Sequence, residues 1–147
     1  MTNLFWEDVR GGQNLPPVVL EISYRRVVLN AASTWDWFPG HHDPFYARAQ
    51  GQATIYLSTL FFHGFVDRLV TDWAGSTSFV CRRKITMRKS IYAGQTATAR
   101  GQVTRVYERD GKGLADIEIS VDNAEGPCVP AEVTVELPRR SAAAAPR

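Results

Sequence analysis

The sequence predicts an α+β fold, with one long, mostly buried helix followed by an antiparallel β-sheet that wraps around it. Two patterns carry this prediction. Apolar side chains recur every four residues through 56–73, which places them on one face of a helix. Beyond residue 77 they instead alternate with polar side chains, as in strands with one buried face. A chain of 147 residues is long enough for one such domain with a substantial core.

The segments before the helix are less regular. Residues 1–16 are expected to form an irregular lead-in, because glycines and prolines interrupt them. Residues 18–29 are rich in β-branched side chains and predict a strand, although Arg25 and Arg26 interrupt it. Residues 44–50 predict a short helix, because Pro44 suits the first turn and Gly51 suits the stop.

The helix predicted over 56–73 has Ser58 as a candidate N-cap and Gly75 as its end. Gly64 lies in its interior, where glycine costs about 1 kcal/mol relative to alanine. We therefore expect another backbone to pack closely against Gly64. The apolar stripe consists of Leu57, Phe61, Phe65, Leu69 and Trp73.

Four strands are predicted after the helix. The first two cover 77–88 and 96–107, and a turn at Asp110-Gly111 leads into a third, whose inward side chains are Ile117, Ile119 and Val121. The fourth occupies 131–137. We expect residues 1–140 to form a single domain and residues 141–147 a disordered tail.

Composition excludes several classes of function. Hydrophobic residues make up 44% of the chain and charged residues 22%, as in ordinary globular proteins. A net charge of +2 gives no reason to expect binding to nucleic acid. Cys81 and Cys128 are far apart, lack metal-ligand spacing and are expected to be reduced thiols. The sequence shows neither an apolar run of the ~18 residues that span a membrane nor a signal peptide, so we expect a cytoplasmic protein.

An aromatic stretch over 35–47 carries the best catalytic candidates. Asp36 and His41 are five residues apart, and Pro39-Gly40 between them stops a helix or strand from continuing. The segment must therefore turn, and a turn can direct both side chains at one water molecule. Histidine, with an ordinary pKa of about 6.5, can accept a proton near neutrality, and Asp36 could deliver one to the substrate. Three rings could shield the pair from solvent, those of Trp35, Trp37 and Phe38.

This stretch resembles the signature of the MaoC-like (R)-specific enoyl-CoA hydratases, Asp-x-x-Pro-x-His followed by x-Asp-Pro-x-Tyr-Ala. Phe38 departs from the pattern, because the family usually has Asn there. The resemblance implies the hot-dog fold, in which an antiparallel sheet wraps around one long central helix. It also implies that Asp36 and His41 hold the water that adds across the double bond of a 2-enoyl coenzyme A thioester. No cofactor or metal is expected. The matching residues are Asp36, Pro39, His41, Asp43, Pro44, Tyr46 and Ala47.

A second segment makes the resemblance more specific. The run from Val70 to Gly75, Val-Thr-Asp-Trp-Ala-Gly, resembles the small MaoC-like hydratase subunits of actinobacterial steroid side-chain degradation. The resemblance as a whole covers roughly residues 15–138. By analogy we expect either a homodimer or a heteromer with another MaoC-like subunit, and a weak preference for a flat, bulky acyl group.

In this family a backbone N–H at the start of the central helix polarises the thioester carbonyl. Counted without a gap from His41, that position is Thr59, with Ser58 beside it among the substrate-binding residues. A five-residue gap would instead use His63-Gly64. We favour Thr59, because the alternative would interrupt the apolar stripe of the helix.

The remaining polar candidates have ordinary structural interpretations beside functional ones. His42 is interpreted as structural and Asp43 as the N-cap of the helix that begins at Pro44. His63 and Asp67, four residues apart, form either a structural contact or a second acid–base site. Trp37 and Phe38 are candidate acyl-binding residues. Arg82 and Arg83 belong either to a solvated strand edge or to a patch for coenzyme A phosphates.

The function predicted on these grounds is hydration of a trans-2-enoyl-CoA to an (R)-3-hydroxyacyl-CoA. Two alternatives stay open. One is a hot-dog acyl-CoA thioesterase, for which Asp67 is the candidate carboxylate. The other is a non-catalytic or co-catalytic subunit of a heteromeric MaoC-like hydratase.

Overall fold

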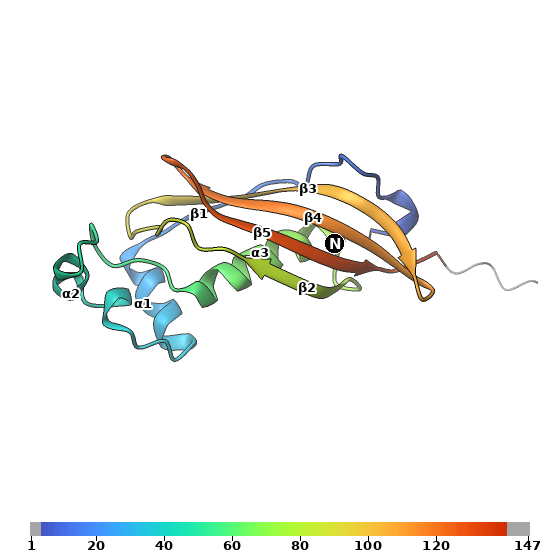
Figure 1. The fold of residues 1–147 in the computed structure, drawn as a ribbon. Helices are drawn as coiled ribbons and strands as arrows, with labels where there is room; N and C mark the ends of the chain where they lie inside the picture. The colour runs from blue at the N-terminus through green and yellow to red at the C-terminus, as the bar shows by residue number, and fades with distance from the viewer. Residues whose placement is uncertain (1–3, 141–147) are drawn as a thin grey trace, which may run out of the picture.

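The structure, a computed structural model, describes residues 4–140, so the tail predicted to be disordered, 141–147, lies outside the described residues. Five antiparallel strands form one sheet in the order β1-β3-β4-β5-β2. The sheet curves along the central helix α3 (Thr59–Ala74), as Figure 1 shows. Its strands are β1 (Val18–Glu21), β2 (Phe79–Ile85), β3 (Thr96–Arg109), β4 (Lys112–Asn123) and β5 (Gly126–Leu137). The predicted hot-dog arrangement is confirmed.

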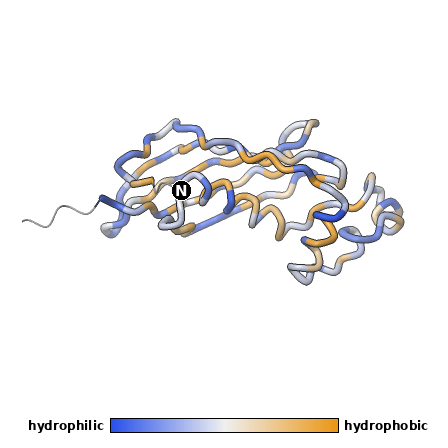
Figure 2. The backbone as a smooth tube through the Cα atoms, turned by 180° about the vertical axis from the view of Figure 1, so that it is seen from behind, coloured by the Kyte–Doolittle hydropathy of each residue, from blue (hydrophilic) through white to orange (hydrophobic). Residues whose placement is uncertain are grey.

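The three longest strands, β3 to β5, form a continuous meander. The β3–β4 hairpin closes at Asp110 and Gly111, both with positive φ (53° and 75°), between the paired residues Arg109 and Lys112. Such a turn suits the right-handed twist of the strands it joins. Hydrophobic and hydrophilic residues alternate along the strands (Figure 2). The buried hydrophobic residues lie on one face of the sheet, and this face covers α3.

The core lies between that face and α3. Ile117 on β4 is 1% exposed, and Phe62 on α3 is fully buried. The other side chains that α3 buries are Phe65, Val66, Leu69, Val70 and Ala74. Because this stripe is wide, burial rather than intrinsic propensity holds the helix in place.

The segment predicted as one strand over 18–29 is instead a short strand and a helix, so that prediction was wrong. The strand β1 ends at Glu21, and α1 occupies Tyr24–Ser33. Ser23 caps α1 by accepting a hydrogen bond from the N–H of Arg26. Val27 and Ala31, four residues apart, are its buried side chains. The cap and this spacing select a helix despite the β-branched residues.

Two expectations about the central helix also need correction. The helix begins at Thr59 rather than at residue 56, because Tyr56 makes an isolated β-bridge with Tyr92. Gly64 is not packed against another backbone, since a Cβ built there meets no atom within 4 Å.

The first and last described residues meet at the end of the molecule opposite α1 and α2 (Figure 1). The N–H of Leu4 donates to the carbonyl of Ala74, and that of Trp6 to the carbonyl of Pro138. Trp6 begins a short 3₁₀ helix, η1 (Trp6–Asp8), and Arg140 holds the Asp8 carboxylate at 2.7 Å. Residues 4–8 are thus held against the end of α3 and the segment that follows β5.

No helix among residues 4–140 is long and apolar enough to cross a membrane. Cys81 is exposed and Cys128 is buried, and both are free thiols.

Candidate functional site

The candidate site lies where three short helical elements meet the start of α3. These are the end of α1, the 3₁₀ turn η2 (Pro39–His41) and α2 (Pro44–Ala49). Asp36 follows the end of α1, and its N–H donates a hydrogen bond to the carbonyl of Ala31. Pro39 opens η2, whose last residue is His41. The proline thus turns the chain between Asp36 and His41, as the sequence predicted.

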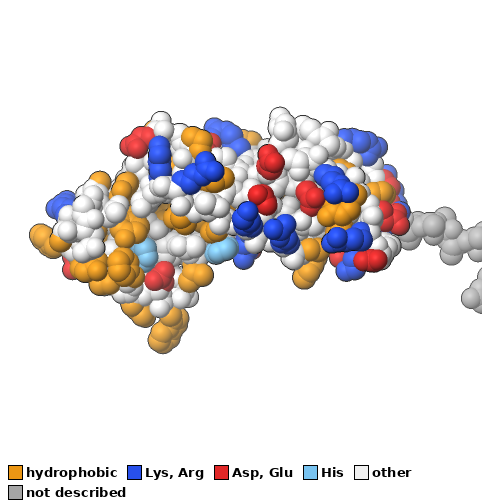
Figure 3. All heavy atoms as spheres, in the orientation of Figure 1, with side chains coloured by type: hydrophobic (Ala, Val, Ile, Leu, Met, Phe, Trp, Pro, Cys, Tyr) orange, Lys and Arg blue, Asp and Glu red, His pale blue; other side chains and the backbone are white. Residues whose placement is uncertain are grey.

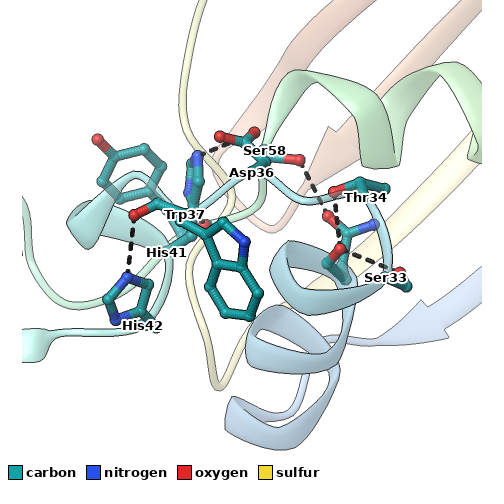
Figure 4. Close-up of polar contacts among 9 residues, drawn as sticks. Ser33, Thr34, Asp36, Trp37, His41, His42 and Ser58 are labelled. Atoms are coloured by element: carbon teal, nitrogen blue, oxygen red, sulfur yellow. Dashed lines mark hydrogen bonds and ion pairs between the residues drawn. The ribbon is translucent and has the colours of Figure 1, made fainter.

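The turn brings the two predicted catalytic side chains together. Asp36 Oδ2 lies 3.6 Å from His41 Nε2, and the two point toward each other in Figure 4. The side chain of His41 is 9% exposed and that of Asp36 is 29% exposed. A spacing of 3.6 Å is longer than a good hydrogen bond, so one water oxygen could contact both groups.

The contact made by the second ring nitrogen, Nδ1, determines the tautomer of His41. Nδ1 lies 2.7 Å from the carbonyl oxygen of Tyr56. A carbonyl can only accept, so Nδ1 carries the hydrogen and donates it. In the neutral ring, Nε2 then presents its lone pair toward Asp36, which is the arrangement that a general base requires.

Aromatic rings fix the position of the imidazole. Phe38 and Tyr56 contact it edge-on, with centroid distances of 5.5 and 5.1 Å. Gly40 lets them approach, because a Cβ there would lie 2.7 Å from both Phe38 Cε1 and Tyr56 Oη. Burial, with a smaller contribution from Tyr46 and Tyr92, raises the pKa of Tyr56, so its phenol stays neutral at physiological pH. Phe38, where the family usually has Asn, thus provides a wall rather than a hydrogen bond.

The start of α3 leaves its first N–H groups available. Ser58 is the N-cap residue, as predicted, but its side chain does not cap the helix. Its buried hydroxyl instead donates to Asn30 Oδ1 at 2.9 Å. Thr59 is the first helical residue, and the first N–H groups of a helix have no intrahelical acceptor. His63 and Gly64 lie in the second turn, so they do not open the helix.

Asn30 is a site residue that the sequence did not reveal. It lies on α1, in a segment interpreted as a strand, and meets Ser58 across 28 residues of sequence. The hydroxyl of Thr34 donates to the backbone carbonyl of Asn30 at 2.8 Å (Figure 4). No local motif signals this pairing, because it depends on how α1 packs beside α3.

The neighbouring residues of the motif have the structural roles predicted for them. Asp43 caps α2, its carboxylate accepting from the N–H groups of Phe45 and Tyr46. His42 Nε2 lies 3.1 Å from the carbonyl of Trp37, which orients its ring away from Asp36 (Figure 4). The side chains of Trp35 and Trp37 are largely exposed, and of the three predicted shielding rings only Phe38 contacts His41.

The two arginines proposed for coenzyme A phosphates are not brought together. Arg83 points toward α3, where its guanidinium pairs with the Asp67 carboxylate and lies 3.4 Å from the carbonyl of His63. Arg82 lines a hollow on the other face of the sheet with Thr104. Successive side chains of a strand point to opposite faces, which explains the separation.

His63 thus belongs to a structural cluster with Asp67 and Arg83. Burial first, and then the Arg83 charge, lower the pKa of His63, while Asp67 opposes the shift. Among residues 4–140, no group of three or more His, Cys, Asp or Glu side chains is arranged to hold a metal ion.

Comparison with known proteins identifies relatives of this chain. No family model matches it. It is 36% identical over 131 residues to the β subunit of 3-oxo-4,17-pregnadiene-20-carboxyl-CoA hydratase of Mycobacterium tuberculosis, a match covering 88% of this chain and 95% of that subunit. A chain of the ChsH1–ChsH2 complex of Mycobacterium tuberculosis has a TM-score of 0.83 at 32% identity, covering 87% of this chain and 98% of that one.

An (R)-hydratase from A. caviae involved in PHA biosynthesis has a TM-score of 0.82 at 21% identity, covering 90% of this chain and 99% of that one. It shows the shared fold. Together with the curated relative, the fold places the protein in a class, the hot-dog hydratases. Within this class the chain belongs to the MaoC-like hydratase family, together with the mycobacterial 3-oxo-4,17-pregnadiene-20-carboxyl-CoA hydratase β subunit.

Proposed function

We propose that this protein hydrates a trans-2-enoyl-CoA to an (R)-3-hydroxyacyl-CoA, and that Asp36 and His41 are its catalytic pair. The observation that carries the proposal is the 3.6 Å approach of Asp36 Oδ2 and His41 Nε2 beside the start of α3. The coenzyme A thioester is the substrate, and no cofactor takes part.

The chemistry follows from the positions of these groups. The water oxygen bonds to C3 of the substrate while His41 Nε2 accepts one water proton. The electron pair of the C2–C3 double bond moves onto C2 and the thioester carbonyl, giving an enolate. The N–H of Thr59, at the positive end of α3, donates to the enolate oxygen. A proton passes from Asp36 to C2, directly or through the water network. The proton held by His41 then passes to Asp36, so both side chains return to their starting protonation states.

A partner subunit is part of the proposal. Large apolar side chains are exposed around the site, and this exposure supports a protein-binding surface there. They gather as orange atoms at one end of the molecule in Figure 3. One solved relative comes from a two-component complex, and the curated relative is named as a subunit. We propose that another MaoC-like subunit covers these residues, Leu29, Trp35, Trp37, Phe38 and Phe45.

The thioesterase alternative loses support from the geometry. Its candidate carboxylate, Asp67, forms an ion pair with Arg83 and faces a strand rather than the start of α3. A carboxylate engaged by a guanidinium in this way is not free to approach a thioester carbonyl. Assay of free thiol release from acyl-CoA separates this activity from hydration.

The test is enoyl-thioester absorbance with substrates from crotonyl-CoA to steroid-sized thioesters, using the chain alone and with any co-purifying MaoC-like protein. Asp36→Asn and His41→Ala should each lower kcat by about 10²-fold or more. His42→Ala is the matched control and should change kcat by less than threefold. Activity near the wild-type level in either site variant would contradict the assignment. Folding is checked by circular dichroism.

The non-catalytic alternative gives a different result. If the chain with its partner is active while Asp36→Asn and His41→Ala change nothing, the chemistry belongs to the partner and this chain only shapes the site.

A further inference from the structure

A groove runs along the exposed side of α3 between that helix and α1. Its cavity volume is about 340 Å³, and Leu60, Phe61, Gly64 and Phe65 form its α3 side. A second hollow of about 640 Å³ adjoins it, and the two share Arg26, Asn30 and Phe61. The α3 side of the groove is mainly apolar, and two cationic side chains also line the groove, Arg26 and Arg68.

Gly64 opens this groove. No atom lies within 4 Å of the position that a Cβ would take, and the residue lies in the interior of α3. Glycine at such a site costs about 1 kcal/mol of helix stability relative to alanine. Neither positive φ nor close packing accounts for it, because α3 is regular there and the space beside Gly64 is open. What glycine provides at this position is room in the groove.

The groove begins at the proposed catalytic site. Asn30, which lines it, accepts the hydrogen bond from Ser58 at the start of α3. Thr34, at the same end of the groove, is two residues from Asp36. Leu60 and Arg68, at the two ends of the α3 side, are eight residues apart, or about 12 Å at the rise of an α-helix. An acyl group whose thioester lies at Thr59 can therefore extend along α3 through the groove.

We infer that this groove binds the flat, bulky ring portion of the acyl group, and that Gly64 determines specificity for it. The inference rests on the proposed function. A rigid ring system can lie against the bare backbone of Gly64 while its edges contact Leu60, Phe61 and Phe65. A short acyl chain gains little there, because it ends before the second turn of α3. A rigid group also loses little conformational entropy on binding.

The decisive variant is Gly64→Leu, which fills the groove. Leucine favours helices more than glycine does, so loss of folding is not expected. For a polycyclic enoyl-CoA, kcat/KM should fall by about tenfold or more, the scale on which a hydrophobic pocket discriminates by size. For crotonyl-CoA it should change by less than threefold. Thr71→Leu adds similar bulk on an exposed position of α3 outside the groove and should spare both substrates.

A binding measurement separates this inference from the proposed function. Cholyl-CoA, a saturated polycyclic thioester that cannot be hydrated, is titrated by calorimetry against wild type, Gly64→Leu and Thr71→Leu, each in the assembly it forms. Weaker binding by Gly64→Leu alone supports the groove even if no enoyl-CoA is hydrated, an outcome that would contradict only the proposed function. Equal binding by all three proteins, or equal losses of kcat/KM for both substrates, would overturn the groove assignment.

Discussion

The long strands of the sheet differ from the helical cap that carries the site, residues 24–58, in how completely they bury their large hydrophobic side chains. In β3, β4 and β5 no large hydrophobic side chain is exposed. The cap exposes several, including Trp35 at 82% and Phe45 at 80%. The long strands bury their hydrophobic side chains within this chain, whereas the cap leaves apolar side chains exposed. Catalytic groups often lie on such segments, because a rigid scaffold can hold a variable site.

The two regions also differ in the forces that position their residues. Burial between sheet and helix holds the strands. In the cap, individual contacts set the geometry, such as the hydrogen bond from His41 to the Tyr56 carbonyl and that from Ser58 to Asn30. Substitutions in the sheet should therefore change stability, and substitutions in the cap should change rate.

The largest expected effect is on the sheet. Ile117→Ala should lower the free energy of unfolding by about 2–5 kcal/mol, because Ile117 is 1% exposed and its truncation leaves a cavity. Urea denaturation measures it. Glu118→Ala, the exposed neighbour on the same strand, should stay within about 0.5 kcal/mol. Protein that remains folded should keep its kcat. A loss of kcat in folded protein would contradict the expectation that substitutions in the sheet change stability alone.

A large effect on rate is also expected at the start of α3. Thr59→Pro removes one N–H and should lower kcat by on the order of 10²-fold, as loss of an oxyanion donor does. Proline is favoured at the first helical position, and Ser58 before it is already extended (φ −77°, ψ 162°). The helix should therefore survive, as circular dichroism can verify.

Thr59→Gly is the matched variant, because it keeps the N–H and should leave most activity intact. An active proline variant would show that the thioester carbonyl is polarised elsewhere.

A smaller effect is expected from a pair of glycine substitutions. Gly40→Ala should lower kcat/KM by on the order of tenfold, because the new Cβ displaces the rings that hold His41. Gly64→Ala meets open space and should stabilise the protein by up to about 1 kcal/mol. Thermal unfolding and kcat/KM for crotonyl-CoA measure both. If the two variants behave alike, the rings around His41 are more adaptable than the structure indicates.

The smallest effect concerns acid stability. The pKa of His63 is lowered from its ordinary 6.5, by burial first and then by Arg83. The unfolded chain therefore binds more protons as pH falls through this value, so the stability that neutral His63 provides is present above pH 6.5 and is lost below it. His63→Gln should reduce the drop in the urea midpoint between pH 7 and pH 5. An unchanged drop would assign the acid sensitivity to other groups.

The sequence predicted the fold best where a pattern of apolar residues extended over many positions. Residues 96–107 were expected as a strand and lie within β3, and the apolar stripe of α3 gave its face correctly. It failed where a single contact decided the outcome. The Ser23 cap makes α1 a helix, a signal that was present and was outweighed by β-branched neighbours. The separation of Arg82 from Arg83 was also implicit, because alternate residues of a strand face opposite ways.

The geometry of the site could be predicted only in part. The proline turn between Asp36 and His41 indicated that they would meet, because it depends on local chain geometry. The Asn30–Ser58 bond and the open space beside Gly64 depend on the packing of α1 against α3, and no local pattern encodes them.

The meeting of the first and last described residues has a practical consequence. Leu4 and Trp6 are hydrogen-bonded to Ala74 and Pro138 at the end of the molecule opposite α1 and α2 (Figure 1). The chain thus enters and leaves the described part of the molecule at the end opposite the helical cap. Two hydratase subunits could be joined end to end, or one immobilised on a surface, while the groove and the Asp36–His41 pair stay open to substrate.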